Sequence, residues 1–218
     1  MIKALIFDLD GTLLNTLDDL RNSTNYALAL HGYPTRSLDE VRQMVGNGVG
    51  KLIERATPDG ISDDDLKQTL ADFRRHYQVH AQDQTRPYDG ILPMLRQCKD
   101  AGLLTAIVSN KPDEAVQLLA EHFFSGLIDA AVGETSGMPR KPAPDMVEKA
   151  LRLLCATKQE AVYIGDSDTD FQTARNAQLP CVSVLWGFRT RQALEAEGAS
   201  CFIDSPEQLL PLIQNQNL

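Results

Sequence analysis

Short apolar runs separated by helix-length stretches recur along most of this chain. Residues 4–7 form the first run, and later runs lie at 104–108, 130–132, 161–164 and 181–185. Short runs that are apolar on both faces are typical of the central strands of a parallel sheet. The alternation of such strands with helices predicts an α/β fold, a doubly wound parallel sheet with right-handed crossovers and helices on both faces.

The stretches between the strands carry apolar residues at helical spacing. The helices expected there span residues 92–101, 113–124, 144–154, 171–177 and 191–197. A last strand is expected at residues 201–203, followed by a terminal helix that Ser205 and Pro206 would cap.

Residues 16–85 follow a different pattern, with no strand alternation. Four helical segments are expected there, at residues 17–30, 38–44, 49–56 and 63–77. Ser62 precedes three aspartates and is the expected N-cap of the last of them, because acidic residues in a first turn complement the helix dipole. The change of pattern predicts an inserted all-helical domain over residues 16–85, and a core domain formed by residues 1–15 and 86–218.

The chain is acidic, with 21 Lys and Arg against 30 Asp and Glu and a formal net charge of -9. This balance argues against non-specific binding of nucleic acid or of an anionic membrane, since both rely on clustered basic side chains. No apolar run resembles a signal peptide or reaches the roughly 18 residues of a membrane span. We therefore expect a cytoplasmic protein without membrane or nucleic-acid partners, acting as a monomer or homodimer.

The four cysteines are scattered along the chain. They lie at positions 98, 155, 181 and 201 and form no Cys-x-x-Cys pair. The spacing predicts neither a disulfide framework nor a zinc site, and we expect reduced, mostly buried thiols.

Polar residues follow three of the predicted strands. Asp8 and Asp10 follow the first, residues 109–111 the second and residues 166–170 a later one, while Lys141 lies in a loop between the last two. The carboxyl ends of these strands converge in a doubly wound sheet. Clustered carboxylates repel one another, so a hard cation is the natural neutraliser, and an oxygen-rich site with open positions suits Mg²⁺. The pattern predicts a Mg²⁺ site for a small phosphorylated metabolite.

The octapeptide at residues 6–13, Ile-Phe-Asp-Leu-Asp-Gly-Thr-Leu, closely matches a known family signature. It resembles the first signature of the haloacid dehalogenase-like phosphatases, in which Asp-x-Asp-Gly-Thr-Leu follows an apolar strand. Ser109, Lys141 and residues 166–170 match the later signatures in the same order, so the resemblance covers nearly the whole chain. It implies a Rossmann-like core and a helical cap inserted between the first two signatures.

The resemblance implies a catalytic mechanism. Asp8 is the expected nucleophile, which forms an aspartyl-phosphate. Asp10 would protonate the leaving oxygen and then activate the water that releases phosphate. Mg²⁺ would be bound by the carboxylates of Asp8 and Asp166 and by the backbone carbonyl of Asp10.

Further residues are expected around the phosphoryl group. Ser109 and Lys141 would bind its oxygens and stabilise the charge of the transition state, with Thr12 and the backbone of Asn110 as additional candidates. Asp170 would orient Lys141 and the waters of the metal. Taken singly, Ser109 is also typical of a strand-end cap, Lys141 of a solvated loop cation and Asp170 of a helix cap.

Part of the predicted cap is similar to the cap of phosphoglycolate phosphatases. A Gly-Asn-Gly loop at residues 46–48 precedes a helix that ends in Glu-Arg-Ala at 54–56. Lys51 and Arg55 lie one helical turn apart on one face, where they could bind a small carboxylate. The alternative is an interhelical turn with solvated cations. The leading expectation is hydrolysis of 2-phosphoglycolate to glycolate and phosphate.

Two positions depart from the family pattern. Asn15-Thr16 replaces the usual Asp-Ser after the first signature, at a hinge-like pair, and Ser109 replaces the commoner Thr but keeps the hydroxyl. Other functions stay open at this point. They are hydrolysis of a sugar phosphate, nucleotide or pyrophosphate, a phosphosugar mutase, a phospho-acceptor signalling module and a catalytically inactive binding protein.

Overall fold

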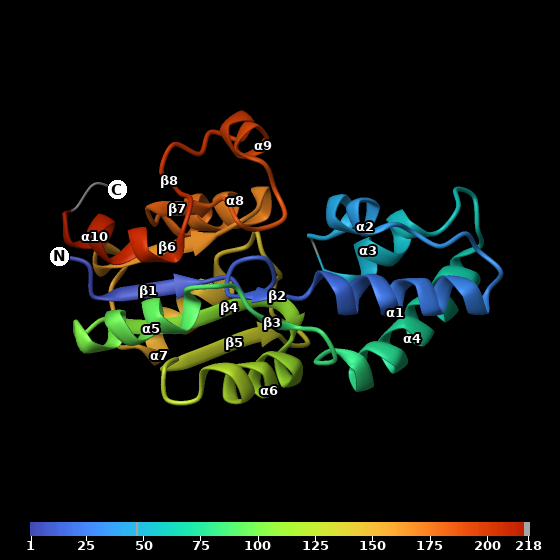
Figure 1. Cartoon of the computed structure of the whole chain (residues 1–218), viewed down its shortest axis with the longest axis horizontal. Coiled ribbons are helices and arrows are strands. Elements are labelled where there is room, and N and C mark those ends of the chain that lie inside the picture. Colours follow the sequence, from blue (N-terminus) through green and yellow to red (C-terminus); the bar gives the residue numbers. More distant parts are fainter. Residues whose placement is uncertain (47, 216–218) are drawn as a thin grey trace. The chain divides into compact units, whose positions relative to one another are not determined.

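The computed structural model describes residues 1–46 and 48–215. It divides into two compact units: a core unit of Met1–Leu14 with Pro87–Leu218, and a helical unit of Asn15–Arg86. Where the chain crosses between the units, β2 (Leu14–Asn15) and β3 (Arg86–Pro87) form a two-stranded sheet (Figure 1). Two-residue strands carry no periodicity, so the sequence pattern did not predict them.

A six-stranded parallel sheet forms the centre of the core unit (Figure 1), which confirms the doubly wound α/β fold. Its strands are β1 (Ala4–Phe7), β4 (Leu104–Pro112), β5 (Ala130–Glu134), β6 (Ala161–Gly165), β7 (Cys181–Val184) and β8 (Phe202–Ile203). The strand order is β5-β4-β1-β6-β7-β8. The chain first extends the sheet on one side of β1 and then returns to build β6 on the other side. Such a reversal opens a crevice at the carboxyl ends of the strands.

The register of the sheet brings three strand ends to one level. Phe7, the last residue of β1, is paired with Ile107 of β4 on one side and with Ile164 of β6 on the other. The residues that follow each of these three positions therefore enter the crevice together. Asp8 is one of them, at the centre.

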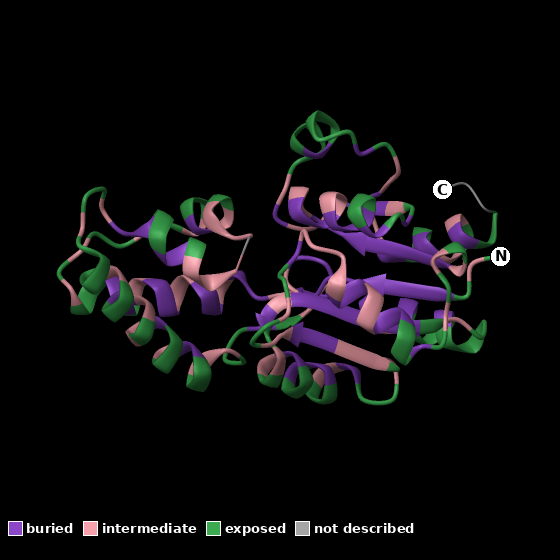
Figure 2. Cartoon of the chain, turned by 180° about the vertical axis from the view of Figure 1, so that it is seen from behind, coloured by how far each residue is buried: buried purple, intermediate pink, exposed green. Residues whose placement is uncertain are grey.

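Helices cover both faces of the sheet. Successive side chains of a strand point to opposite faces and therefore pack against different helices. Leu5 and Phe7 of β1 pack with α5 (Ile91–Asp100), α6 (Asp113–Phe124) and α10 (Leu209–Gln214). Ala4 and Ile6 pack on the other face with α7 (Asp145–Leu153) and α8 (Asp168–Ala177). Figure 2 shows the buried strands between helices that are green on their outer sides. Each fully buried aliphatic side chain contributes roughly 1.5–3 kcal/mol, so this core holds the strand ends rigidly.

The remaining short elements of the core unit complete this arrangement. They are α9 (Arg191–Ala196) and the 3₁₀ turns Lys158–Glu160 and Pro206–Gln208. The terminal helix thus begins with a 3₁₀ turn. Ser205 is its N-cap residue and Pro206 follows at the first position as expected, but the Ser205 hydroxyl donates to Glu207 (2.9 Å) and forms no cap hydrogen bond with a backbone N–H.

Strand β4 runs further than the expected 104–108. Its ladder with β5 shifts register between Val108 and Pro112, and the polar residues 109–111 lie in that irregular part. A shift of register changes the direction of the side chains while the strand continues. A hydrophobic pattern does not reveal such a shift.

The helical unit contains α1 (Leu17–Leu30), α2 (Leu38–Met44), α3 (Val49–Ala56) and α4 (Asp63–His80). Apolar residues at helical spacing, such as Leu20, Ala27 and Leu28 of α1 and Phe73 of α4, form its interior. Ser62 caps α4 as expected, since its hydroxyl accepts the N–H of Asp65 (3.1 Å). Helix α4 runs three residues beyond the expected end because no Gly or Pro interrupts residues 78–80.

The four cysteines are free thiols, but they are not mostly buried. Cys98 is buried, Cys181 and Cys201 are partly exposed, and Cys155 is exposed in the turn after α7.

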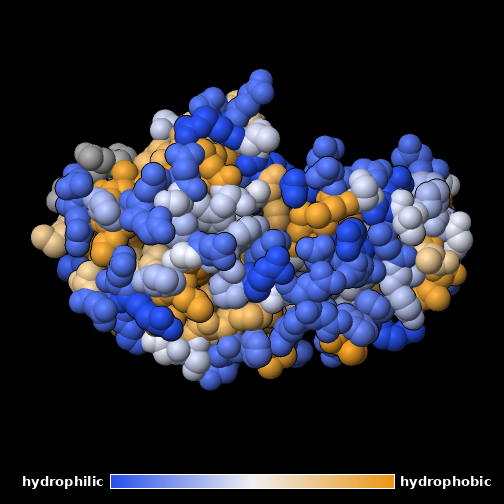
Figure 3. Space-filling model, viewed as in Figure 1, coloured by the Kyte–Doolittle hydropathy of each residue, from blue (hydrophilic) through white to orange (hydrophobic). Residues whose placement is uncertain are grey.

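On the face in Figure 3, hydrophilic residues divide the hydrophobic ones into separate groups. Within the described residues, no helix has the length and apolar character needed to span a membrane.

Asp19 ties the start of α1 to the segment that follows α4. Its buried carboxylate accepts the backbone N–H groups of Gln84 (3.0 Å) and Thr85 (2.8 Å). A carboxylate that accepts backbone N–H groups in a buried site forms strong, charge-assisted hydrogen bonds. Asp19 is therefore a polar contact that joins the two ends of the helical unit.

Replacing Asp19 by Ala should lower the free energy of unfolding by about 2 kcal/mol, because the backbone N–H groups of Gln84 and of the buried Thr85 lose their acceptor. Asp18→Ala is the matched control: Asp18 lies in the same first turn, and its contact is a partly exposed ion pair with Arg21 (3.4 Å). It should cost no more than about 0.5 kcal/mol. Urea unfolding of both variants measures this, and equal losses would contradict the joining role of Asp19.

Candidate active site

Lys141 lies at the centre of a buried cluster at the carboxyl ends of the strands. Its ammonium donates to Asp8 Oδ1 (2.6 Å), Asp170 Oδ1 (2.8 Å) and the hydroxyl of Tyr163 (3.2 Å). Only 5% of Lys141 is exposed, and Asp8 and Asp170 are also buried. Asp8 extends from the end of β1, Tyr163 from β6 and Asp170 from the first turn of α8, so two strands and one helix fix the partners of the ammonium.

Asp170 is held by the turn that begins α8. This helix starts at Asp168, earlier than expected, because Ser167 and Asp170 form a capping box. Asp170 Oδ2 accepts the N–H of Ser167 (3.1 Å), which leaves Oδ1 directed at Lys141 and Tyr163. Gly165 admits this side chain, since a Cβ there would lie 2.3 Å from the Cβ of Asp170.

Asp166 lies between two glycines. Its Oδ1 accepts the hydroxyl of Thr12 (3.2 Å) and its Oδ2 the N–H of Phe188 (2.7 Å). A Cβ at Gly11 or at Gly187 would come within 2.5 or 2.3 Å of the Asp166 side chain. Only glycine therefore fits at either position, and Gly11 also has a φ of 91°. Thr12, which stays a candidate contact of the phosphoryl group, thus also holds Asp166.

Ser109 and Asn110 follow Val108 in the irregular part of β4. The Asn110 side chain accepts the N–H of Lys141 (2.8 Å) and donates to its carbonyl (3.1 Å), so it fixes the Lys141 backbone. Ser109 is buried, and its oxygen accepts the N–H of Lys111 (3.2 Å). Its O–H can still donate to a ligand.

Two residues of this region were missed by sequence reasoning. Lys111 donates from its ammonium to both carboxylate oxygens of Asp10, at 2.9 and 3.0 Å. Tyr163 donates to Asp170 Oδ1 (3.0 Å) from the middle of an apolar strand. A lysine directly after Ser109 and Asn110 was a signal for Lys111, whereas a single Tyr in a buried strand gives none.

The carboxylates of Asp8, Asp166 and Asp170 bring ligand atoms within 4.8 Å of one another. Burial and the Asp170 charge raise the pKa of Asp8 well above its usual value, against the opposing effect of Lys141. Burial and Asp170 likewise raise the pKa of Asp166 to about 7. Burial would lower the pKa of Lys141, but the carboxylates of Asp170 and Asp8 outweigh it and raise that pKa.

Three ionised carboxylates around one ammonium would leave two uncompensated negative charges in a buried place. A divalent cation would remove this imbalance and favour the ionised forms. The donors are oxygen atoms only, which suits a hard cation. The cluster therefore fits a divalent metal ion.

The two cap candidates belong to the helical unit and already have partners there. Lys51 is exposed on α3 and pairs with Glu54 (2.7 Å). Arg55, one turn further along, donates to the carbonyl of Met44 (2.8 Å). Asn47 of the glycine loop lies outside the described residues.

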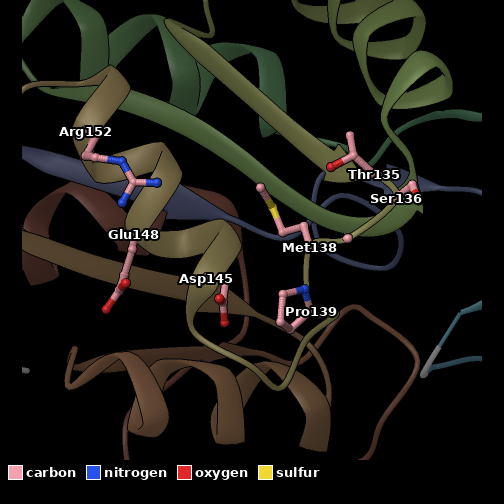
Figure 4. A pocket seen from close by; sticks show the side chains of 8 residues that line it. Thr135, Ser136, Met138, Pro139, Asp145, Glu148 and Arg152 are labelled. Atoms are coloured by element: carbon pink, nitrogen blue, oxygen red, sulfur yellow. The ribbon is translucent and has the colours of Figure 1, made fainter.

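Two hollows on the core unit lie outside the acidic cluster. The larger, of about 360 Å³, separates α7 from the loop before it (Figure 4), and its lining residues are Thr135, Ser136, Gly137, Met138, Pro139, Asp145, Glu148 and Arg152. The other, of about 300 Å³, lies beside α6 and β5. Neither hollow contains a residue of the cluster.

Comparison with known proteins places this arrangement in a family. The family model of haloacid dehalogenase-like hydrolases matches residues 5–184. A phosphoglycolate phosphatase of Pseudomonas putida is 32% identical over 96% of this chain and 79% of its own length. One from Rhodobacter capsulatus is 34% identical over 87% of both chains.

Solved structures agree with this assignment. A crystal structure from Lactobacillus delbrueckii subsp. bulgaricus superposes with a TM-score of 0.91, at 36% identity over 95% of this chain and 96% of that chain. A predicted phosphoglycolate phosphatase from Haemophilus somnus superposes with a TM-score of 0.88, at 26% identity over 97% and 98%. This chain belongs to the haloacid dehalogenase-like hydrolases and resembles their phosphoglycolate phosphatases.

Proposed function

We propose that this chain is a Mg²⁺-dependent phosphomonoesterase that acts through an aspartyl-phosphate and hydrolyses 2-phosphoglycolate to glycolate and phosphate. The observation that carries the proposal is the contact of 2.6 Å between Asp8 at the tip of β1 and the buried ammonium of Lys141. A carboxylate held by a cation at an open strand end is suited to attack phosphorus. The cytoplasm is the compartment proposed for this activity.

Asp8 is the proposed nucleophile. Lys141 holds Oδ1, which orients the other oxygen for attack on phosphorus. The new bond joins this oxygen to phosphorus while the bond from phosphorus to the leaving oxygen breaks. Lys141 and the hydroxyl of Ser109 stabilise the negative charge on the phosphoryl oxygens.

Asp10 is the proposed acid and base. Its proton passes to the leaving oxygen as the ester bond breaks. It then takes a proton from the water that attacks the phosphorus of the aspartyl-phosphate, which restores the carboxylate of Asp8 and releases phosphate. Asp10 is more exposed than Asp8, as a group that meets both substrate and water must be.

The residues proposed to hold Mg²⁺ are Asp8 and Asp166 through their carboxylates and Asp10 through its backbone carbonyl. When bound, Mg²⁺ supplies positive charge that neutralises the phosphoryl oxygens. Asp170 completes the acidic cluster, and its contact with Lys141 supports a positioning role.

The choice of phosphoglycolate rests on the relatives. Those from P. putida and R. capsulatus carry the name phosphoglycolate phosphatase. A structural relative at 26% identity, CbbY from Rhodobacter sphaeroides, was solved in complex with phosphate, in agreement with a phosphoryl-binding site. The helical unit would act as a cap, with Lys51 and Arg55 as candidate contacts for the substrate's carboxylate.

Asp8→Asn should reduce phosphate release by a factor of about 10³ or more, because an amide is a poor nucleophile. The fold should persist, since the amide oxygen can still accept from Lys141. A phosphate-release screen over phosphoglycolate, sugar phosphates, nucleotides and pyrophosphate, with Mg²⁺ and after chelation, tests both the substrate and the metal. Wild-type turnover by the variant, with an unchanged thermal melt, would rule out the covalent mechanism.

Asp10→Asn should suppress hydrolysis of alkyl phosphates, while a substrate with a good leaving group still phosphorylates Asp8, because that group needs little protonation. Acid quenching followed by mass measurement of the intact chain would detect the trapped phosphoryl group. An unimpaired rate on an alkyl phosphate would remove Asp10 from the acid-base role.

Replacing Arg55 or Lys51 by Ala should cost roughly ten- to a hundredfold in kcat/KM for phosphoglycolate, if one charge-assisted contact is lost. The loss should be much smaller for an aryl phosphate, which has no carboxylate. Equal losses on both substrates would indicate a structural role in the helical unit, and no loss in either variant would exclude these cap contacts.

A further inference from the structure

Lys111 is a buried cation that the mechanism above leaves without a function. Only 2% of its side chain is exposed, against 19% for that of Asp10. Its backbone is held beside the phosphoryl site, because its N–H donates to the hydroxyl oxygen of Ser109 (3.2 Å). Lys111 thus links the residue proposed to bind the phosphoryl group with the residue proposed to protonate the leaving oxygen.

Both oxygens of Asp10 are engaged by this one ammonium, at 2.9 and 3.0 Å. The proposed chemistry requires an oxygen of Asp10 to face the leaving oxygen of the substrate. The contact with Lys111 must therefore loosen when substrate binds. A buried ammonium that loses an anionic partner is disfavoured, so an anionic group of the substrate is the natural replacement for Asp10.

The cation at the centre of the cluster cannot perform this exchange. Lys141 is already shared by Asp8 and Asp170, and the Asn110 side chain holds its backbone. Lys111 is bound instead to a side chain that is one-fifth exposed. The pair of Lys111 and Asp10 is thus an ion pair at the strand ends whose carboxylate is partly open to solvent.

A substrate of the proposed class carries the anion that is needed. In phosphoglycolate the carboxylate carbon lies two bonds from the leaving oxygen. A cation that touches the acid of the leaving oxygen is therefore also within reach of that carboxylate. The inference rests on the proposed function and identifies a substrate-binding residue within the core unit.

We propose that Lys111 binds the substrate's carboxylate, which replaces Asp10 on the ammonium and releases Asp10 toward the leaving oxygen. The substrate's carboxylate replaces that of Asp10 on the ammonium, so Lys111 keeps an anionic partner, and the released Asp10 carboxylate takes up a proton from solvent before it protonates the leaving oxygen. The substrates favoured by this site are small phosphomonoesters with an anionic group next to the ester oxygen. A neutral alcohol phosphate leaves Asp10 on Lys111 and is hydrolysed more slowly.

The test compares phosphoglycolate with ethyl phosphate, a substrate of similar size that lacks the carboxylate. In Lys111→Met, kcat/KM for phosphoglycolate should fall at least about tenfold more than kcat/KM for ethyl phosphate, the loss expected for one charge-assisted contact. Lys111→Arg should recover part of this preference because it keeps the cation. Lys158→Met removes a lysine of the core unit that pairs with Glu148 (3.0 Å) and should retain the wild-type preference.

A second measurement does not depend on the turnover of either substrate. Inhibition of p-nitrophenyl phosphate hydrolysis by 3-phosphonopropionate, a stable analogue of phosphoglycolate, is compared with inhibition by propylphosphonate. Lys111→Met should raise the inhibition constant of the carboxylate analogue about tenfold more than that of propylphosphonate. If Lys111→Met does not fold in a thermal melt, Lys111→Gln, which keeps a hydrogen-bond donor, is used in both measurements.

The outcomes separate this proposal from the proposed function. A wild-type chain that turns over phosphoglycolate no faster than ethyl phosphate would overturn the proposed substrate, and with it the role of Lys111. A wild-type preference that persists in Lys111→Met would leave the proposed function intact and overturn the carboxylate contact. Equal losses on both substrates and both inhibitors would show that Lys111 only positions Asp10.

Discussion

The ammonium of Lys141 is the charge on which the catalytic end of this sheet depends. It is buried with Asp8 and Asp170, whose carboxylates have oxygen atoms within 4.8 Å of each other. Without the ammonium these two carboxylates would repel each other. Removing one partner of a buried ion pair commonly costs 3–5 kcal/mol, because the other charge is left without compensation. The lysine comes from a loop, so its position depends on the Asn110 side chain and on the sheet that carries the carboxylates. Nucleophile, cation and acidic cluster are thus one electrostatic unit.

The fold was largely readable from the sequence, because strands and helices of this chain bury their apolar residues with regular periods. The run at residues 4–7 is β1 without change, and several helices begin and end as expected. What the pattern could not supply is local geometry. The shifted register of β4 and the two-residue strands β2 and β3 depend on hydrogen bonds between distant segments, which leave no periodic trace.

The candidate site shows the same division. The order of acids along the chain was enough to expect Asp8, Asp166, Asp170 and Lys141 at one end of the sheet, and the structure brings these four together. The order of residues along the chain did not predict which hydrogen-bond partner each side chain has. Thr12 and the backbone of Asn110 were expected near the phosphoryl group, and the sequence did not reveal that the Thr12 hydroxyl holds Asp166 or that the Asn110 side chain holds the Lys141 backbone. A one-dimensional pattern places residues at an edge, but it does not say which neighbour each side chain selects.

The glycines on either side of Asp166 restrict which acid can serve there. The carboxyl group already occupies the space that a methyl group at Gly11 or Gly187 would need. Glutamate has the same charge but is longer by one methylene group, and that length has no room between two backbone segments. Glutamate therefore cannot replace Asp166 unless the backbone segments at Gly11 and Gly187 move apart. The dimensions of the backbone, more than the charge of the side chain, decide which residue can occupy this position.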